Sequence, residues 1–287
     1  MIVLLSIFWG MSFFWIALGL RELSPFTMVL YRIGIAAAVV TLFLYARGGR
    51  LPFAFSAWRK FFTIGAFNNF LPFSLITCGQ IYIDSGLASI LNATTPLFAV
   101  VMAHFLTSDE HMTANRIIGV LLGIAGVALL MGPEALLGLT SNALGQLAIL
   151  GAAMSYAYGG ICVRQLKDIP VLEAMSGTLI AATVLTLPVA LVLEYPLQTS
   201  LELNTIVALF GMSVLGTAIA YRLYFHVIRT VGATNTLLVT FLVPITALLM
   251  GVLVLGESLN KHAILGMLVI FTGLLAVDGR IFRKLFT

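Results

Sequence analysis

The stretch "LNATTPLFAV" (residues 91–100) lies inside a segment, residues 85–108, that contains no Asp, Glu, Lys or Arg. This segment is long enough to cross a membrane, because a spanning helix needs about 20 apolar residues. Yet Asn92, Thr95 and Pro96 stand near its midpoint. Polar groups in hydrocarbon cost free energy unless a partner satisfies them. These residues must therefore face either other protein or a wet cavity that holds cargo.

The composition shows that this segment is one of many. Of the 287 residues, 61% are hydrophobic and 9% are charged, with a mean hydropathy of +1.10. A soluble protein carries about 25% charged residues, so the solvent of this chain is lipid. The first stretch lacks the basic start and the cleavage site of a signal peptide, which predicts a retained helix. Ten nearly uncharged stretches can each hold one transmembrane helix: residues 1–20, 23–46, 61–83, 85–108, 117–133, 135–163, 174–193, 203–221, 230–256 and 262–277.

The basic residues gather at one membrane face when the N-terminus is placed inside. Only Arg21 and Lys261 then fall outside, and Arg32 lies within a span. Cytoplasmic loops carry an excess of Lys and Arg, so we expect a multi-pass protein of the bacterial inner membrane with both termini cytoplasmic. The net charge of +4 thus reflects topology and does not indicate a nucleic-acid partner. The residues on the cytoplasmic side are Arg47, Arg50, Arg59, Lys60, Arg116, Arg164, Lys167, Arg222, Arg229, Arg280, Arg283 and Lys284.

The chain contains an internal repeat. "TPLFAVVM" (95–102) matches "VPITALLM" (243–250), and "EHMTANRIIGVLLGIAG" (110–126) matches "ESLNKHAILGMLVIFTG" (257–273). The offset covers five spans, and because five is odd the second copy must enter the membrane from the opposite side. Inverted repeats of this kind are typical of transporters, whose binding site lies where the halves meet.

This pattern predicts an all-α integral membrane protein of ten transmembrane helices, built as two inverted five-helix repeats. We expect the first repeat to cover residues 1–134 and the second to cover residues 135–287.

Several short motifs resemble those of one known superfamily. They are "FWG" (8–10), "LYRIGIAAAV" (30–39), the proline-centred fourth stretch, "GVLLGIAGVALL" (119–130) and "LGES" (255–258). In this order they resemble the drug/metabolite transporter superfamily, in its ten-helix, EamA-like branch, and are most similar to the bacterial amino-acid exporters. The resemblance covers essentially the whole chain. It implies the fold and a transport function, but the superfamily moves amino acids, sugars, nucleotides and drugs.

Polar and aromatic residues within the spans are the candidates for contact with cargo. Aromatic walls with a few amides suit a ligand that has an apolar body and a zwitterionic head. The alternative is that the aromatics fill the bundle and that the amides and hydroxyls bond neighbouring helices. The candidate substrate-binding residues are Trp9, Asn68, Asn69, Gln80, Tyr82, Asn92, Thr95, Tyr156, Tyr158 and Tyr221.

Two proline residues and one arginine make specific structural predictions. Pro96 and Pro244 each remove a backbone donor, which leaves the carbonyls of Asn92 and Thr240 free. We expect Pro96 to break its helix and to turn Asn92 and Thr95 toward the cavity, opposite Trp9 and the tyrosines. Arg32 either pairs with Asp84 at the outer end of the third stretch or extends its side chain to the membrane surface.

The leading functional hypothesis is export of amino acids, aromatic or otherwise hydrophobic, and of related metabolites, by alternating access through a central midplane cavity. Multidrug or other small-metabolite efflux is the alternative, although the first helix lacks the glutamate of the small multidrug exporters. A receptor or scaffold would leave the inverted repeat unexplained.

No chemistry-bearing constellation favours an enzyme. The histidines are scattered at helix ends, and Cys78 and Cys162 fall within spans, where apolar packing is favoured over a disulfide or metal pair. We therefore expect no catalytic residue, no metal and no cofactor. The expected partners are a small-molecule substrate and the lipid bilayer, with the chain acting as a monomer. No Asp or Glu stands at mid-depth, which favours passive release or exchange over proton antiport.

Overall fold

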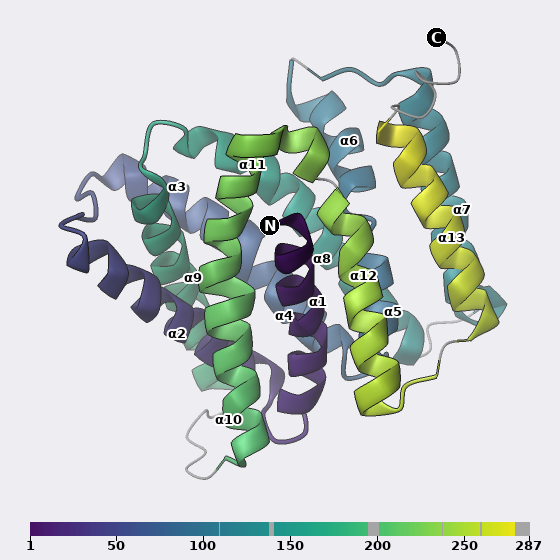
Figure 1. Cartoon of the computed structure of the whole chain (residues 1–287), viewed down its shortest axis with the longest axis horizontal. Helices are drawn as coiled ribbons and strands as arrows, with labels where there is room; N and C mark the ends of the chain where they lie inside the picture. The colour runs from purple at the N-terminus through teal and green to yellow at the C-terminus, as the bar shows by residue number, and fades with distance from the viewer. Residues whose placement is uncertain (109, 138–140, 195–200, 237, 259, 279–287) are drawn as a thin grey trace.

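A computed structural model of the chain describes residues 1–108, 110–137, 141–194, 201–236, 238–258 and 260–278 (Figure 1). Within these ranges every regular element is helical. The α-helices are α1 (Ile2–Gly19), α2 (Pro25–Ala46), α3 (Phe55–Gly65), α4 (Leu71–Gly79), α5 (Ser85–Asn92), α6 (Thr95–Leu106), α7 (Ala114–Leu137), α8 (Ser141–Val163), α9 (Val171–Leu193), α10 (Leu203–Phe210), α11 (Ala220–Thr236), α12 (Leu238–Met250) and α13 (Lys261–Asp278). Three π-helical segments are η1 (Ala66–Phe70), η3 (Gly211–Ile219) and η4 (Gly251–Leu255), and η2 (Arg164–Leu166) is a 3₁₀ turn.

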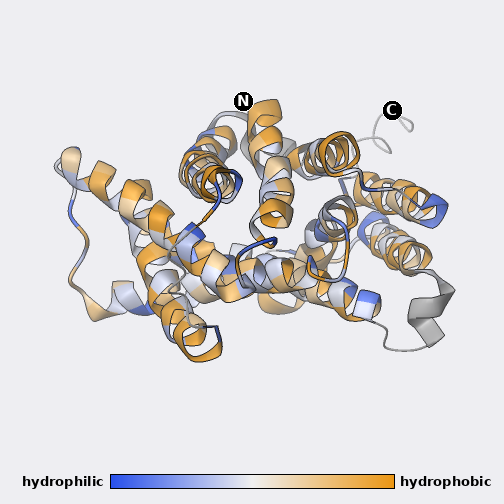
Figure 2. Ribbon diagram, turned by 90° about the horizontal axis from the view of Figure 1, so that it is seen from below, coloured by the Kyte–Doolittle hydropathy of each residue, from blue (hydrophilic) through white to orange (hydrophobic). Residues whose placement is uncertain are grey.

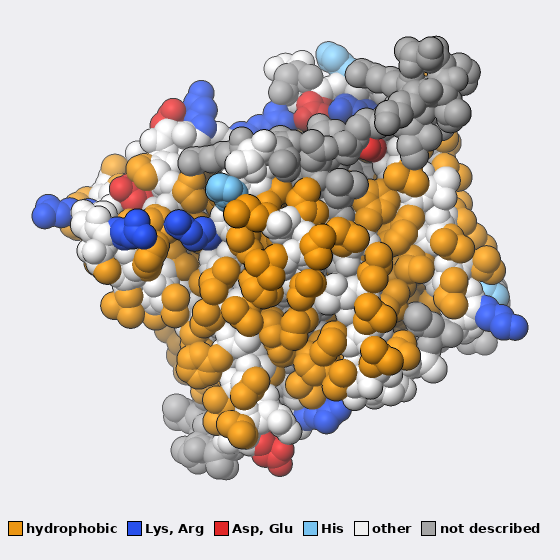
Figure 3. Space-filling view, in the orientation of Figure 1, with side chains coloured by type: hydrophobic (Ala, Val, Ile, Leu, Met, Phe, Trp, Pro, Cys, Tyr) orange, Lys and Arg blue, Asp and Glu red, His pale blue; other side chains and the backbone are white. Residues whose placement is uncertain are grey.

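The helices join into spans of membrane length. Nine runs among the described residues are long and apolar enough to cross a membrane, and the shorter apolar helix Val239–Leu255 supplies a tenth. The prediction of ten helices is therefore confirmed. The face seen in Figure 3 is mostly hydrophobic between charged groups at its upper and lower margins. Seen from below in Figure 2, most of each helix is white to orange, and blue is confined to short stretches. Such an apolar surface is stable in contact with lipid and would be unfavourable in contact with water.

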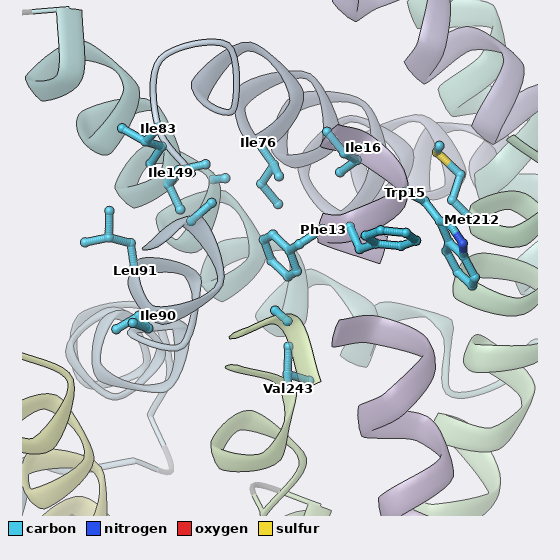
Figure 4. Packing of buried hydrophobic residues seen from close by; sticks show 14 of the residues in the cluster. Phe13, Trp15, Ile16, Ile76, Ile83, Ile90, Leu91, Ile149, Met212 and Val243 are labelled. Atoms are coloured by element: carbon cyan, nitrogen blue, oxygen red, sulfur yellow. The ribbon is translucent and has the colours of Figure 1, made fainter. Parts of the chain in front are cut away.

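The first helix occupies the middle of the bundle. In Figure 1, α1 descends between α12 and the α10–α11 span, and it contacts α12, η3 and α10. Phe13, Trp15 and Ile16 of α1 are at most 5% exposed. Figure 4 shows these side chains beside Met212 and Val243, which come from the second half of the chain. The core thus joins the two halves around α1. We call the end of the bundle at which α1 begins the near end, and the opposite end the far end.

The packing of α7 against α13 shows the inverted relationship of the halves directly. The two helices lie side by side at one edge of the bundle (Figure 1). A Cβ atom at Gly119 would lie 2.5 Å from the Gly273 carbonyl, and one at Gly266 would lie 2.7 Å from the Gly126 carbonyl. Gly119 matches Gly266 in the repeat, and Gly126 matches Gly273, so the two contacts exchange under the repeat. The glycines therefore serve close helix packing.

Two equivalent spans are distorted. The third span, Phe55–Gly79, contains η1, and the eighth, Leu203–Val227, contains η3. A π-helical segment widens the backbone ladder, so its carbonyls and side chains are redirected, and such segments are frequent at functional sites. Both segments lie near the middle of their spans. The distortions therefore put irregular backbone at membrane depth, which is tolerated only where protein or a wet cavity surrounds it.

Candidate functional site

One tyrosine links the π-helical segment η1 of the first half to the helix that follows η3 in the second half. The Tyr221 hydroxyl donates to the Asn69 side-chain oxygen at 2.7 Å and lies 3.4 Å from the Asn68 carbonyl oxygen. Asn68 and Asn69 belong to η1, and Tyr221 follows η3 in α11. Asn69 is 1% exposed. The bond therefore joins the first repeat to the second inside the membrane, at the place where the sequence predicted a site between halves.

Arg32 of α2 enters the same region. Its Nε donates to the Thr217 hydroxyl of η3 at 3.2 Å, and its guanidinium carbon lies 3.8 Å from the centre of the Phe73 ring. The side chain is 5% exposed. Thr217 in turn donates to the Met212 carbonyl at 2.9 Å, a π-helical carbonyl that this hydroxyl satisfies. A guanidinium over an aromatic face is an attractive arrangement, especially away from water.

Aromatic rings surround this polar pair. Tyr156 of α8 packs edge-to-face on Phe73 with ring centres 6.4 Å apart. The Tyr156 and Tyr221 phenols lie close enough to Arg32 to interact with its charge. Both tyrosines are half-buried. We call this group, Arg32, Asn68, Asn69, Phe73, Tyr156, Thr217 and Tyr221, the inter-repeat site.

A second aromatic pair adjoins the inter-repeat site. Trp9 of α1 and Tyr224 of α11 have ring centres 5.4 Å apart, with their planes tilted by 45°. Tyr224 lies within electrostatic range of Tyr221, one turn earlier on the same helix. The structure therefore brings five of the predicted substrate-binding residues into one region: Trp9, Asn68, Asn69, Tyr156 and Tyr221.

Three other candidates lie elsewhere. Tyr82 is in the turn between α4 and α5 and is 46% exposed. Tyr158 is half-buried, lies edge-to-face with Phe67 at 4.7 Å, and packs against a separate hydrophobic cluster that contains Phe61 and Cys162. Gln80 ends α4, where its Nε2 donates to the Phe13 carbonyl at 3.0 Å and its Oε1 is buried without a hydrogen bond. The first two are outside the inter-repeat site, and the third ties α4 to α1.

The proline in the opening stretch does break its helix. α5 ends at Asn92, α6 begins at Thr95, and Ala93 and Thr94 form the turn between them. The Asn92 carbonyl, however, is not free as the sequence led us to expect, because the Thr95 hydroxyl donates to it at 2.7 Å. It is the Asn92 side-chain oxygen that is buried without a hydrogen bond. No described hydrogen bond or ring contact joins Asn92 or Thr95 to the inter-repeat site.

The predicted pairing of Arg32 with Asp84 is wrong. Asp84 is exposed at the far end, before α5, while Arg32 is buried against Phe73. Partial burial, and secondarily the nearby Glu257 carboxylate, raise the pKa of Asp84. Snorkelling is also wrong, since a side chain that is 5% exposed does not reach the membrane surface. The Arg32 guanidinium instead packs on the Phe73 ring inside the bundle.

Sequence reasoning left three members of the inter-repeat site off its substrate-binding list, namely Arg32, Phe73 and Thr217. One signal was present, because Asn69 and Phe73 are four residues apart and share a helical face. Thr217 gave no such signal, since its partner lies 185 residues away. Among the described residues no group of three or more His, Cys, Asp or Glu could hold a metal ion, and both cysteines are free thiols.

With this architecture in place, the chain matches the EamA-like transporter family twice, over residues 1–132 and 143–277. The chain belongs to this family. It is a non-enzymatic, multi-pass membrane transporter, and the double match agrees with two repeats.

Individual relatives span nearly the same length. The chain is 24% identical over 275 residues to the "Uncharacterized transporter YoaV" of Bacillus subtilis, and the aligned region covers 95% of this chain and 94% of that protein. It is 25% identical over 260 residues to the "Uncharacterized inner membrane transporter YedA" of Escherichia coli, with 90% and 82% covered. "Protein PecM" of Dickeya dadantii is 25% identical over 273 residues, with 94% and 88% covered. One solved structure, titled "Crystal structure of protein", has a TM-score of 0.67 at 19% identity and covers 100% of this chain and 98% of that one, which supports the fold.

Proposed function

We propose that this transporter exports amino acids with aromatic or other hydrophobic side chains, and that the inter-repeat site holds them between the halves. The observation that carries the proposal is the Tyr221–Asn69 hydrogen bond. It joins η1 of the first repeat to α11 of the second, directly after η3 and beside aromatic side chains. Alternating access requires a site that both halves share.

The chemistry of the site fits such a cargo. Two asparagines and a phenol offer both donors and acceptors, which the ammonium and carboxylate groups of an amino acid require. Tyr156, Phe73 and the Trp9–Tyr224 pair offer ring faces and edges for an apolar side chain. A sugar would call for more hydrogen-bonding groups than this region holds, and a wholly apolar drug would leave the asparagines unpaired.

The remaining sequence predictions belong to this proposal. We place both termini in the cytoplasm of a bacterial cell on the distribution of Lys and Arg, and we place the boundary of the repeats between residues 134 and 135. Asn92, with its unpaired side-chain oxygen, is a second polar contact for cargo, and Thr95 supports the break beside it. The protein works as a monomer and without a proton gradient.

The test is counterflow in proteoliposomes, with a panel of radiolabelled amino acids and with and without a pH gradient. We expect phenylalanine, tyrosine or leucine to exchange faster than lysine or aspartate, at a rate that is unchanged when the gradient is collapsed. Tyr221→Phe removes the bond to Asn69 and should slow exchange about fivefold to tenfold, the equivalent of one hydrogen bond.

Tyr158→Phe is the matched control, because it removes the same hydroxyl from a tyrosine outside the inter-repeat site, and it should leave exchange unchanged. Exchange of cationic drugs without exchange of any amino acid would overturn the proposal in favour of drug efflux. A rate that falls when the pH gradient is collapsed would overturn the passive mode, and would direct attention to His104 and His226.

A further inference from the structure

Arg32 is a buried cation that has no counter-ion among the described residues. It is 5% exposed within a membrane-spanning helix, and no described carboxylate forms an ion pair with it. A charge at this depth is costly, so an intramembrane arginine is almost always paired or functional. The ring of Phe73 and one neutral hydroxyl, that of Thr217, offset only part of that cost.

The contacts of Arg32 leave most of its donors unused. A guanidinium has five N–H groups in a planar fork. One, on Nε, bonds Thr217, while neither terminal nitrogen forms a hydrogen bond to a described residue. Phe73 covers one face of the plane. The fork is thus held at one edge and on one face, and its outer edge stays available for an acceptor.

The neighbours of that outer edge are also informative. Tyr156 and Tyr221 lie within electrostatic range of Arg32, and both are half-buried. The Tyr221 hydroxyl donates its proton to Asn69. A small anion beside Arg32 would therefore lie next to aromatic rings and a side chain that is itself 5% exposed. Charge-assisted hydrogen bonds are strong under these conditions.

We propose that Arg32 is the receptor for the carboxylate of the transported molecule. This proposal rests on the proposed function, and it names the group that fixes the cargo's orientation. The terminal nitrogens of Arg32 bind the carboxylate through two parallel hydrogen bonds, a geometry that guanidinium matches and ammonium does not. The side chain of the cargo then lies on Tyr156 and the neighbouring rings. An amine without a carboxylate leaves the arginine unpaired and is rejected.

The first arm of the test uses the unmodified protein and three ligands of one shape. L-phenylalanine carries both charged groups, 3-phenylpropionate lacks the ammonium, and phenethylamine lacks the carboxylate. Each is added to purified protein, and thermal unfolding and competition with labelled phenylalanine are measured. We expect phenylalanine and phenylpropionate to compete, and phenethylamine to compete at least about tenfold more weakly, as the loss of a charged hydrogen bond predicts. Equal competition by phenethylamine overturns the assignment without any variant.

The second arm uses three substitutions. Arg32→Gln removes the charge, Arg32→Lys keeps the charge but not the fork, and Thr217→Val removes the bond at Nε together with the Thr217 bond to the Met212 carbonyl. The affinity for phenylalanine should fall about tenfold to a hundredfold in Arg32→Gln, less in Arg32→Lys, and least in Thr217→Val. Affinity for phenethylamine should stay the same or rise in Arg32→Gln, which a merely unfolded site cannot produce.

The outcomes separate this inference from the transport proposal. If Arg32→Gln exchanges phenylalanine as well as the unmodified protein, Arg32 is a structural residue and amino-acid export still stands. If the unmodified protein exchanges no amino acid and none of the three ligands binds, both proposals fail.

Discussion

Glu110 and Glu257 occupy matching positions in the two repeats, yet they make different contacts. Glu257 lies at the far end and caps α5 of the other half: the Ser85 amide donates to its Oε1 at 2.9 Å, and the Ser85 hydroxyl and Gly86 amide donate to its Oε2 at 2.9 and 3.1 Å. Glu110 lies at the near end, where it forms ion pairs with Arg116 at 3.2 Å and Arg164 at 2.8 Å. The pair at Arg164 is exposed to solvent.

The contrast extends to the surrounding contacts between halves. At the far end Glu194 caps a second helix of the first repeat, accepting from the amides of Phe26 and Thr27 at 3.0 and 2.6 Å. At the near end an exposed Lys60 ammonium donates to the Gln165 carbonyl at 3.1 Å. A carboxylate on unpaired amides at a helix N-terminus satisfies orphan donors and favours the helix dipole, whereas an exposed ion pair is screened by water.

This difference shows that two repeats of similar sequence can make unequal contacts at the two ends of the bundle. The far end is held by part-buried caps and the near end by surface pairs, although the repeat supplies a glutamate to both. A transporter with inverted repeats opens its two ends in turn. Here the two ends are held by contacts of different kinds.

The largest predicted effect compares the two glutamates directly. Glu257→Ala removes the cap and leaves the buried Ser85 hydroxyl and two amides unpaired, so the free energy of unfolding should fall by about 2 kcal/mol. Glu110→Ala removes exposed pairs and should cost under about 1 kcal/mol. Thermal unfolding of the two purified variants in one detergent measures both. Equal losses would show that the two ends are held alike and would break the comparison.

A smaller effect compares the two proline-containing helices. Pro96 separates α5 from α6, while Pro244 stands inside α12 without ending it. Asn92→Ala should slow exchange about fivefold, the value of one hydrogen bond to cargo, with the unfolding temperature unchanged. Thr240→Ala is the matched control at the repeat-equivalent position and should change neither quantity. If Asn92→Ala is less stable but exchanges normally, Asn92 bonds helices and does not contact cargo.

The smallest effect concerns Asp84, which stands at the N-cap position of α5 but makes no side-chain cap bond, since Glu257 takes the amides. Its raised pKa means that the folded state binds a proton more readily than the unfolded state. The favourable contribution of Asp84 to the free energy of unfolding is complete below its pKa in the unfolded state. It is lost as the pH rises through its pKa in the folded state. Asp84→Asn should therefore stabilise the protein at pH 7, by under about 0.5 kcal/mol because the group is exposed and screened.

The effect of Asp84→Asn on stability should change sign in the Glu257→Ala variant. In Glu257→Ala the amides of α5 are free, and Asp84 can cap its own helix. Asp84→Asn should then be neutral or destabilising. Unfolding temperatures of the two single variants and the double variant at pH 7 complete the cycle. Identical effects of Asp84→Asn in both backgrounds would show that Glu257 and Asp84 act independently.

The sequence by itself determined the number of spans and the two-repeat plan. A bilayer imposes a local rule, because each span must be apolar over about 20 residues, and this rule can be counted along the chain. The glycine contacts of α7 and α13 were likewise foreshadowed by matched glycines in the repeat. The break of the helix at Pro96 could also be predicted, because the missing backbone donor is a property of the proline itself.

Only the tertiary structure decided which polar groups meet. Arg32 lies on Phe73 and bonds Thr217, and Tyr221 bonds Asn69, through partners separated by up to 185 residues. The sequence placed these residues at membrane depth but gave no information on how each helix is rotated about its axis. Ser, Thr, Asn and aromatic residues occur both in helix packing and in binding sites, so their presence does not decide which way they face. The rotation of each helix is fixed by what packs against it, and here Asn69 of one π-helical segment and Thr217 of another each bond a side chain from the opposite half.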